Sequence, residues 1–234
     1  MKARAISLLA VLVLFIAPLA RGDVIELTLV ASTVPTVITV TDNGVWDNNL
    51  AVGKINWAGI VGSWEVDVAL GIMDPHGYPL GSIDLTSTDG TPAYGESLEI
   101  YFTRYNMAMP SALFQMDIGG TIIGTGSALT YTAYRDNSNA LYGTAATIGT
   151  LGPYAGSASP GTSFSGGTSG WAPGPFDPLV SYSITQRVIL TSTSTEAMSA
   201  SFDADLQPVP EPATGILFGL GALALGTFLR RRFA

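Results

Sequence analysis

The sequence has no cysteine and a single histidine, His76, in 234 residues, and only 12% of its residues are charged. Without cysteine the chain cannot form disulfides, thiolate metal sites, iron–sulfur centres or a thiolate nucleophile. One histidine excludes metal motifs that need two imidazoles and leaves one candidate for a catalytic triad. That histidine lies in a turn-like run, Asp-Pro-His-Gly-Tyr-Pro at 74–79, so we interpret it as an exposed turn residue.

Basic residues are also scarce. The chain has 10 of them against 18 acidic residues, and six of the 10 lie near the two ends. The segment from Asp23 to Glu211 holds all 18 acidic residues and four basic ones, which gives it a net charge of −14; the four are Lys54, Arg104, Arg135 and Arg187. Nucleic acid is therefore excluded as a partner, because phosphates require a surface rich in lysine and arginine.

The N-terminus has the layout of a secretory signal. A short basic region at 1–4 precedes an apolar run at 5–17, and Ala20 and Gly22 supply small residues for a cut before Asp23. We therefore predict a helical signal peptide at 1–22, handled by Sec-type export machinery and signal peptidase. The alternative, an N-terminal anchor helix, is disfavoured because the apolar run is too short to span a bilayer comfortably.

The C-terminus combines three features in a fixed order. Pro210, Glu211 and Pro212 come first, an uncharged stretch at 213–229 follows, and an arginine cluster ends the chain: Arg230, Arg231 and Arg232. As a helix the uncharged stretch would be about 26 Å long, which suits a transmembrane helix in a thin bilayer. The arginines predict a cytoplasmic stop, with the preceding domain held outside. The prolines keep the motif extended and accessible.

This combination resembles the PEP-CTERM sorting signal of bacterial exported proteins, over residues 208–234. The resemblance implies recognition by exosortase, an integral-membrane enzyme, and processing near Pro210, Glu211 and Pro212. It also implies a Gram-negative bacterium that makes exopolysaccharide and biofilm. The protein would then be anchored transiently in the inner membrane before it reaches the cell surface or the extracellular matrix. The alternative is an ordinary membrane anchor that contains Pro-Glu-Pro by coincidence.

The segment between the ends, 23–207, shows a β pattern throughout. Apolar residues alternate with polar ones over 63–70, 97–103, 112–118, 182–191 and 201–206, and further strands are expected near 24–30, 34–41, 82–88 and 121–134. Eight to ten strands with one buried face, and no helical crossovers, predict an all-β antiparallel β-sandwich, jelly-roll-like. A closed barrel is the alternative.

One stretch of this domain departs from the pattern. Residues 143–175 contain nine glycines and four prolines and carry no charge. We expect a Gly/Pro/Ser-rich loop here. Two alternatives are a cover over a sheet edge, made by the aromatic residues of the stretch, and a loop that contacts a ligand.

Few residues suggest chemistry. No Gly-x-Ser-x-Gly motif occurs, and the nominal carboxylate pairs, 65 with 67, 96 with 99 and 203 with 205, are best explained as solvated strand faces. Calcium is the one cofactor worth considering, because carboxylate and amide oxygens cluster at Asp42, Asn43 and Asp47 and again around Asp136. Asn, Asp and Gly are equally typical of turns, so turn chemistry is the preferred interpretation.

The sequence thus predicts an exported, exosortase-sorted surface or matrix protein without catalytic activity, associated with extracellular polysaccharide. The main alternative is a carbohydrate-binding, lectin-like module that uses exposed rings, with or without bound calcium. Trp46, Trp57, Tyr94, Tyr154 and Trp171 are the aromatic candidates. An envelope hydrolase using His76 or a carboxylate pair has no positive feature in its favour.

Overall fold

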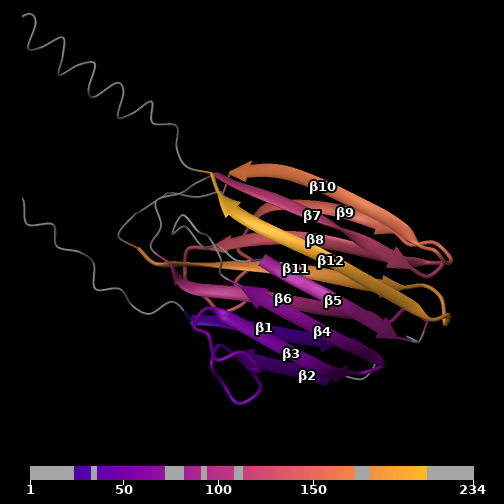
Figure 1. Cartoon of the computed structure of the whole chain (residues 1–234). Coiled ribbons are helices and arrows are strands. Elements are labelled where there is room, and N and C mark those ends of the chain that lie inside the picture. The colour runs from indigo at the N-terminus through magenta and orange to yellow at the C-terminus, as the bar shows by residue number, and fades with distance from the viewer. Residues whose placement is uncertain are drawn as a thin grey trace, which may run out of the picture.

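The structure, a computed structural model, describes residues 24–32, 36–71, 82–90, 94–107, 113–171 and 180–209, with the backbone alone for 82–89. These residues form twelve strands in two six-stranded sheets (Figure 1). Sheet 1 has the order β2 (Thr36–Thr41), β1 (Val24–Ala31), β6 (Ser97–Met107), β11 (Tyr182–Ser192), β8 (Ser127–Asp136) and β9 (Ala146–Ala155). Sheet 2 has the order β10 (Thr162–Trp171), β7 (Leu113–Ile123), β12 (Met198–Pro208), β5 (Ser82–Gly90), β4 (Trp64–Gly71) and β3 (Lys54–Val61).

All pairings between these strands are antiparallel, so the predicted all-β antiparallel class is confirmed. Alternation directs the packing, as β4 shows: Trp64 and Val66 are buried, while Glu65 and Asp67 between them are exposed. Each side chain of the apolar parity adds about 1.5–3 kcal/mol through burial. The core lies between the sheets, and its largest fully buried side chains are Trp64, Tyr131, Tyr182, Phe102 and Phe114.

The predicted loop at 143–175 is wrong, because this stretch contains β9 and β10, which are edge strands of the two sheets. Glycine lets the two strands approach closely: a Cβ on Gly170 would lie 2.0 Å from the carbonyl oxygen of Ile148. The rings of Tyr154 on β9 and Phe164 on β10 stack with centroids 4.6 Å apart. Glycines that suggested a loop therefore serve close packing between strands.

Two further expectations also need correction. The stretch at 121–134 is not one strand, because a turn separates β7 from β8. Gly124 and Gly126 in that turn have φ values of 125° and 77°, which favour glycine. The strand count of eight to ten was too low, since β3, β9 and β10 were not expected as strands.

The first and last strands begin and end at the same end of the sandwich (Figure 1). β12 is a central strand, held between β7 and β5. The last hydrogen bond described joins the amide of Val209 to the carbonyl of Leu113 at 2.9 Å. The fold therefore needs the chain as far as residue 209. The predicted helices at 1–22 and 213–229 lie outside the described residues.

Candidate functional site

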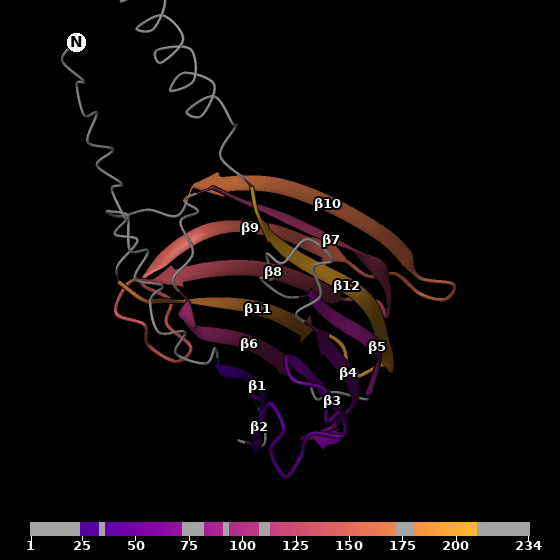
Figure 2. The same cartoon turned by 60° about the vertical axis from the view of Figure 1, so that its left-hand side comes forward.

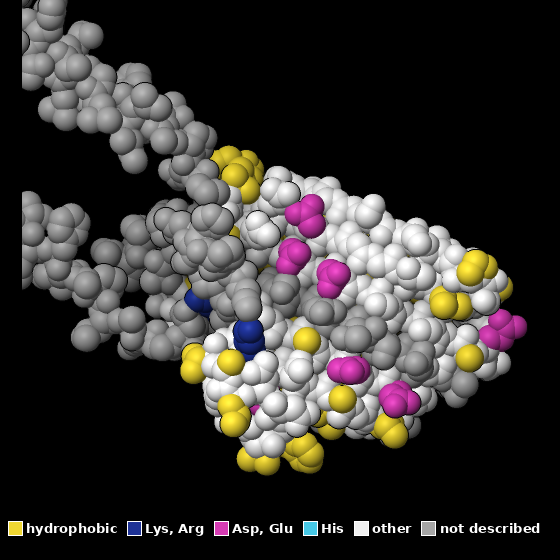
Figure 3. Space-filling model, viewed as in Figure 1, with side chains coloured by type: hydrophobic (Ala, Val, Ile, Leu, Met, Phe, Trp, Pro, Cys, Tyr) yellow, Lys and Arg dark blue, Asp and Glu magenta, His cyan; other side chains and the backbone are white. Residues whose placement is uncertain are grey.

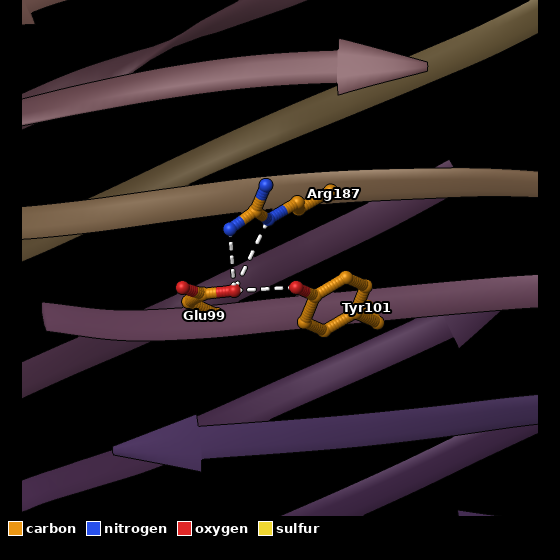
Figure 4. Close-up of polar contacts among 3 residues, drawn as sticks. All are labelled: Glu99, Tyr101 and Arg187. Carbon is orange, nitrogen blue, oxygen red and sulfur yellow. Dashed lines mark hydrogen bonds and ion pairs between the residues drawn. The ribbon is translucent and has the colours of Figure 1, made fainter. Parts of the chain in front are cut away.

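Three charged or aromatic side chains form a network on the outer face of sheet 1 (Figure 4). Glu99 and Tyr101 lie on β6, and Arg187 projects from the neighbouring β11, directly opposite Tyr101. The Tyr101 hydroxyl donates to Oε2 of Glu99 at 2.5 Å, and the same oxygen accepts from Nη2 of Arg187 at 2.7 Å and from Nε at 3.1 Å. The Arg187 guanidinium lies 5.3 Å from the Tyr101 ring centroid.

The pKa shifts of Tyr101 and Arg187 both reflect their contacts with Glu99. Burial, followed by the hydrogen bond and the charge of Glu99, raises the pKa of Tyr101 to about 12. Burial opposes the charge on Arg187, but the hydrogen bond to Glu99 and the charges nearby raise its pKa overall. Arg187 and Glu99 remain about a quarter exposed. The network is therefore a preorganised polar surface that solvent and ligands can reach.

The β8–β9 connection, residues 137–145, covers one end of this face. Tyr142 reaches across to β1, where its hydroxyl donates to Glu26 and bonds with the Thr28 hydroxyl at 2.5 Å. Its ring meets the Tyr101 ring edge-on, with centroids 5.8 Å apart. Burial and Glu26 raise the pKa of Tyr142 well above its ordinary value. The connection thus forms a wall beside the Glu99–Tyr101–Arg187 network.

This arrangement offers partly exposed rings beside a planar cation and a carboxylate. Such groups stack on apolar sugar faces and bond to hydroxyls, and none of them is an activated nucleophile. Sequence reasoning missed the site. The period-two pattern placed Glu99, Tyr101 and Arg187 on the polar parity of their strands, but the pairing of β6 with β11 could not be read from it.

The outer face of sheet 2 is acidic, as Figure 3 shows. Asp205 on β12 lies directly opposite Asp117 on β7, and Asp203 is two residues along the same strand. Glu65 and Asp67 extend the face onto β4. Burial first, and then the charges of Asp203 and Asp117, raise the pKa of Asp205. The nominal pairs 65 with 67 and 203 with 205 therefore share a sheet face, as predicted from their spacing.

The third nominal pair is not brought together. Glu96 is buried and accepts a hydrogen bond from Ser63 at 2.7 Å, whereas Glu99 faces outward on sheet 1. Ser63 also lines a shallow groove of about 530 Å³, which lies at the end of sheet 2 where β12 begins. The groove is lined by Ile60, Gly62, Ser63, Glu65, Gly90, Ile123, Ala197, Met198 and Ser199.

The first cluster of candidate calcium ligands is used by its own turn. The Asp47 carboxylate is buried and accepts from three backbone amides, those of Asn43 at 2.9 Å, Asn49 at 2.8 Å and Asn56 at 3.0 Å. Oδ2 of Asp42 accepts from the Gly53 amide at 2.9 Å, and Oδ1 accepts from the Asn43 side chain at 3.0 Å. These bonds occupy the oxygens that a cation would need.

Asp136 lies at the end of β8, and its Oδ1 accepts from the amide and the hydroxyl of Ser138 at 2.7 Å and 2.6 Å. Three strands, β1, β6 and β11, separate β8 from β2, after which Asp42 follows. At about 4.8 Å per strand the two clusters are roughly 19 Å apart. Over the described ranges, no three acidic or imidazole side chains meet as metal ligands would. The calcium prediction gains no support from this geometry.

The aromatic candidates do not share one site. Trp57 is buried in the core, and Tyr154 packs on Phe164. Trp46 in the β2–β3 connection and Trp171 at the end of β10 are exposed at opposite edges of the sandwich. Tyr94 is also exposed, and it lies just before β6, an inner strand of sheet 1.

Several predicted sites lie outside the described residues: His76, the motif Pro210, Glu211 and Pro212, and the arginines 230–232. Among the residues that the structure does describe, none forms a helix of the length and apolarity that crossing a membrane requires.

Comparison with known families identifies the C-terminus. Residues 208–232 match the PEP-CTERM protein-sorting motif, so the resemblance seen in the sequence is confirmed. The motif implies an exported protein sorted by exosortase, with delivery to the cell surface in Gram-negative bacteria. The central domain is not assigned to a family, and no curated protein matched the chain.

Three of the solved structures that match this chain illustrate how remote the likeness is. One is the enzymatically active domain of tailspike protein 4 of bacteriophage CBA120 (15% identity, TM-score 0.32, 71% of this chain and 21% of that one). The others are a mannan-recognising carbohydrate-binding module (7%, 0.30, 67% and 90%) and a module of the β-sandwich superfamily described as promiscuous in specificity (10%, 0.31, 77% and 72%). The chain spans about a fifth of the tailspike domain. TM-scores this low do not support an inference about function.

Proposed function

We propose that this protein is a non-catalytic component of the cell surface or extracellular matrix, released to its destination by exosortase and associated with exopolysaccharide. One observation carries the proposal. The sorting motif begins at residue 208, where β12 ends, and the last bond of the sandwich described is made by Val209. A cut near Pro210, Glu211 and Pro212 would leave every described strand in the released domain.

The proposal of a non-catalytic role rests on how the carboxylates are used. Glu65, Asp67 and Asp203 are exposed on a sheet face, and Asp47 is bonded to three amides of its own turn. Catalytic carboxylates typically work as a pair with contrasting environments inside a cleft. Such a pair does not occur among the described carboxylates named here.

Intact-mass analysis of the exported form tests the sorting proposal. In a cell that contains exosortase we expect the mass to show loss of both the signal peptide and the C-terminal residues beyond the motif. A matched strain without exosortase, and a variant with Glu211→Ala and Pro212→Ala, should retain the C-terminal segment. Identical masses in the two strains would refute exosortase processing.

A second function is favoured by a specific site, the Glu99–Tyr101–Arg187 network with the wall formed by Tyr142. We propose that this face binds the neutral or cationic sugar units of a polysaccharide through ring stacking and hydroxyl hydrogen bonds. The net charge of −14 between Asp23 and Glu211 disfavours polyanionic glycans.

Glycan-array binding by the exported protein tests this second proposal. We expect a discrete set of glycans to bind, and Tyr101→Leu or Arg187→Gln to reduce the affinity at least tenfold. Asp203→Asn, on the opposite sheet, is the matched control and should bind as the unaltered chain does. Unchanged binding in both sheet 1 variants, with their folds verified by circular dichroism, would exclude this face as the site.

A further inference from the structure

Exposed hydrophobic side chains gather at one end of the sandwich, the end where β1 begins and β12 ends. Of the ten large hydrophobic side chains that are exposed in the described ranges, seven lie at that end: Val45, Trp46, Leu50, Val52, Leu141, Trp171 and Val180. The other three lie toward the opposite end: Val37, Ile60 and Tyr94. Soluble proteins rarely expose large apolar patches that have no partner, so this end is a candidate interaction surface.

The β2–β3 connection, residues 42–53, turns its hydrophobic side chains outward and its carboxylates inward. Four of its side chains expose 65% to 97% of their area: Val45, Trp46, Leu50 and Val52. The buried Asp47 carboxylate accepts from three backbone amides, and the Gly53 amide donates to Asp42. These bonds fix the shape of the connection and satisfy backbone groups that are costly to remove from water. The connection is therefore built to meet an apolar medium.

The predicted membrane helix begins beside these residues. Trp171 at the end of β10 pairs with Leu113, and the carbonyl of Leu113 accepts the amide of Val209. The uncharged stretch at 213–229 begins four residues after Val209, a separation of at most about 14 Å even in an extended chain. β1 also begins at this end, directly after the predicted signal peptide at 1–22. A bilayer that holds 213–229 therefore lies close to the exposed hydrophobic side chains.

The breadth and chemistry of this surface favour lipid over a peptide or a sugar. Trp46 lies in the connection that leads into β3, and Trp171 ends β10 (Figure 2). These two edge strands of sheet 2 are five strand spacings apart, roughly 24 Å. A bilayer is wide enough to contact both rings. Tryptophan is enriched where membranes meet water, whereas the aliphatic side chains of the connection lack the flat ring on which sugars stack.

We infer that this end of the sandwich rests on the lipid bilayer that anchors the chain, with the hydrophobic side chains of 42–53 and Trp171 in its headgroup layer. The inference takes the position of the bilayer from the sorting proposal and adds the contact between domain and lipid. Few side chains suffice for this contact while the helix tethers the domain to the membrane. The chain then leaves β12 at the membrane surface, where exosortase acts, and the Glu99–Tyr101–Arg187 network faces sideways, open to glycans.

A fluorescent label on an introduced cysteine tests the contact, because the chain has no cysteine of its own. The full chain is added to phosphatidylcholine vesicles with the label at Leu50→Cys or, as the matched control, at Tyr94→Cys, which is exposed at the opposite end. We expect brominated acyl chains to lower the emission at position 50 about twofold or more and to leave that at position 94 unchanged. Equal quenching at the two positions overturns the inference. A label at position 50 that is shielded from water but not quenched by bromine also overturns it, because a second copy or another protein then covers the connection.

Co-sedimentation with the vesicles separates this inference from the sorting proposal. The predicted helix at 213–229 is sufficient to carry the chain into the vesicle pellet. A chain that pellets without quenching at position 50 refutes the lipid contact and leaves the anchor standing. A chain that does not pellet refutes the anchor and the lipid contact together.

Removal of the hydrophobic side chains provides the second test, with the label moved to Trp171→Cys. The loop variant replaces the four exposed hydrophobic residues of the connection: Val45→Ser, Trp46→Ser, Leu50→Ser and Val52→Ser. The control variant replaces the three at the opposite end: Val37→Ser, Ile60→Ser and Tyr94→Ser. We expect bromine quenching at position 171 to fall about twofold or more in the loop variant only, because the two edges meet the bilayer as one surface. All seven side chains are exposed, so both variants should fold, as circular dichroism verifies. Unchanged quenching in the loop variant, or an equal fall in the control, contradicts the inference.

Discussion

Asp205 on β12 lies directly opposite Asp117 on β7, so two carboxylates face each other across neighbouring strands. Like charges in this position are destabilising, and the raised pKa of Asp205 reflects burial first and the charges of Asp203 and Asp117 after it. The acidic face of sheet 2 therefore lowers the stability of the fold at neutral pH.

Replacing Asp205 with Asn should stabilise the domain. We expect the free energy of unfolding at pH 7 to rise by about 0.5 kcal/mol, measured by urea denaturation. Asp67→Asn, whose cross-strand neighbour is the neutral Ser87, is the control and should change stability less. A loss of stability in Asp205→Asn would show that the carboxylate makes a favourable contact.

The pH dependence of stability follows from the same residue. Because the folded pKa of Asp205 is raised above 3.8, the folded state takes up its proton first as the pH falls. The contribution of Asp205 to stability is therefore full below the unfolded pKa and is lost as the pH rises through the folded pKa. Urea midpoints between pH 3 and 7 should show this slope in the unaltered chain, and a smaller one in Asp205→Asn.

Replacing Glu99 with Gln should lower the pKa of Tyr101 from about 12 toward its ordinary value of 10.0. Both the charge and the charged acceptor are lost, while burial remains, so the shift should be partial. Tyrosine-selective NMR titration measures it. Glu26→Gln is the matched control, because Glu26 bonds to Tyr142 and not to Tyr101. An unchanged Tyr101 titration would assign the whole shift to burial.

Replacing Asp47 with Ala should destabilise the fold by about 2–3 kcal/mol, because three backbone amides lose their acceptor. Asp47→Asn keeps one acceptor oxygen and should cost less. Thermal unfolding measures both variants. The same measurement with calcium or with a chelator tests the calcium prediction. We expect a shift of less than about 1 °C, whereas a rise of several degrees that Asp47→Asn abolishes would establish a cation site here.

Replacing Tyr131 with Phe should cost about 1–2 kcal/mol of stability, measured by urea denaturation. The Tyr131 hydroxyl is fully buried and donates to Oε1 of Gln186 at 2.5 Å. Removing this hydroxyl takes a hydrogen-bond donor away from the buried side-chain amide of Gln186. The double variant with Gln186→Leu should lose less than the sum of the two single changes, since both partners are then apolar. Strict additivity would show that the two groups are not coupled.

Much of the fold could be predicted from the sequence, where alternation was strong. The runs around Trp64, Phe102 and Phe202 bury the side chains that their parity indicated, because a strand with one wet face leaves a period-two signal. β9 and β10 could not be predicted in this way. Their glycines and serines carry no hydrophobic alternation, and only the approach of Gly170 to Ile148 explains why glycine is there.

The sequence alone identified the C-terminal sorting motif, with Pro-Glu-Pro before an uncharged stretch and a terminal arginine cluster, and it predicted a signal peptide from an apolar run behind basic residues. These signals are local and linear, so their meaning does not depend on the fold. Only the tertiary structure revealed the candidate site and the edge position of β10. Glu99 and Arg187 are 88 residues apart in the sequence, and they meet because β6 pairs with β11. β10 lies at a rim because of its place in the strand order. Period two fixes the face of a side chain, but pairing across long loops is set by the packing of the whole domain.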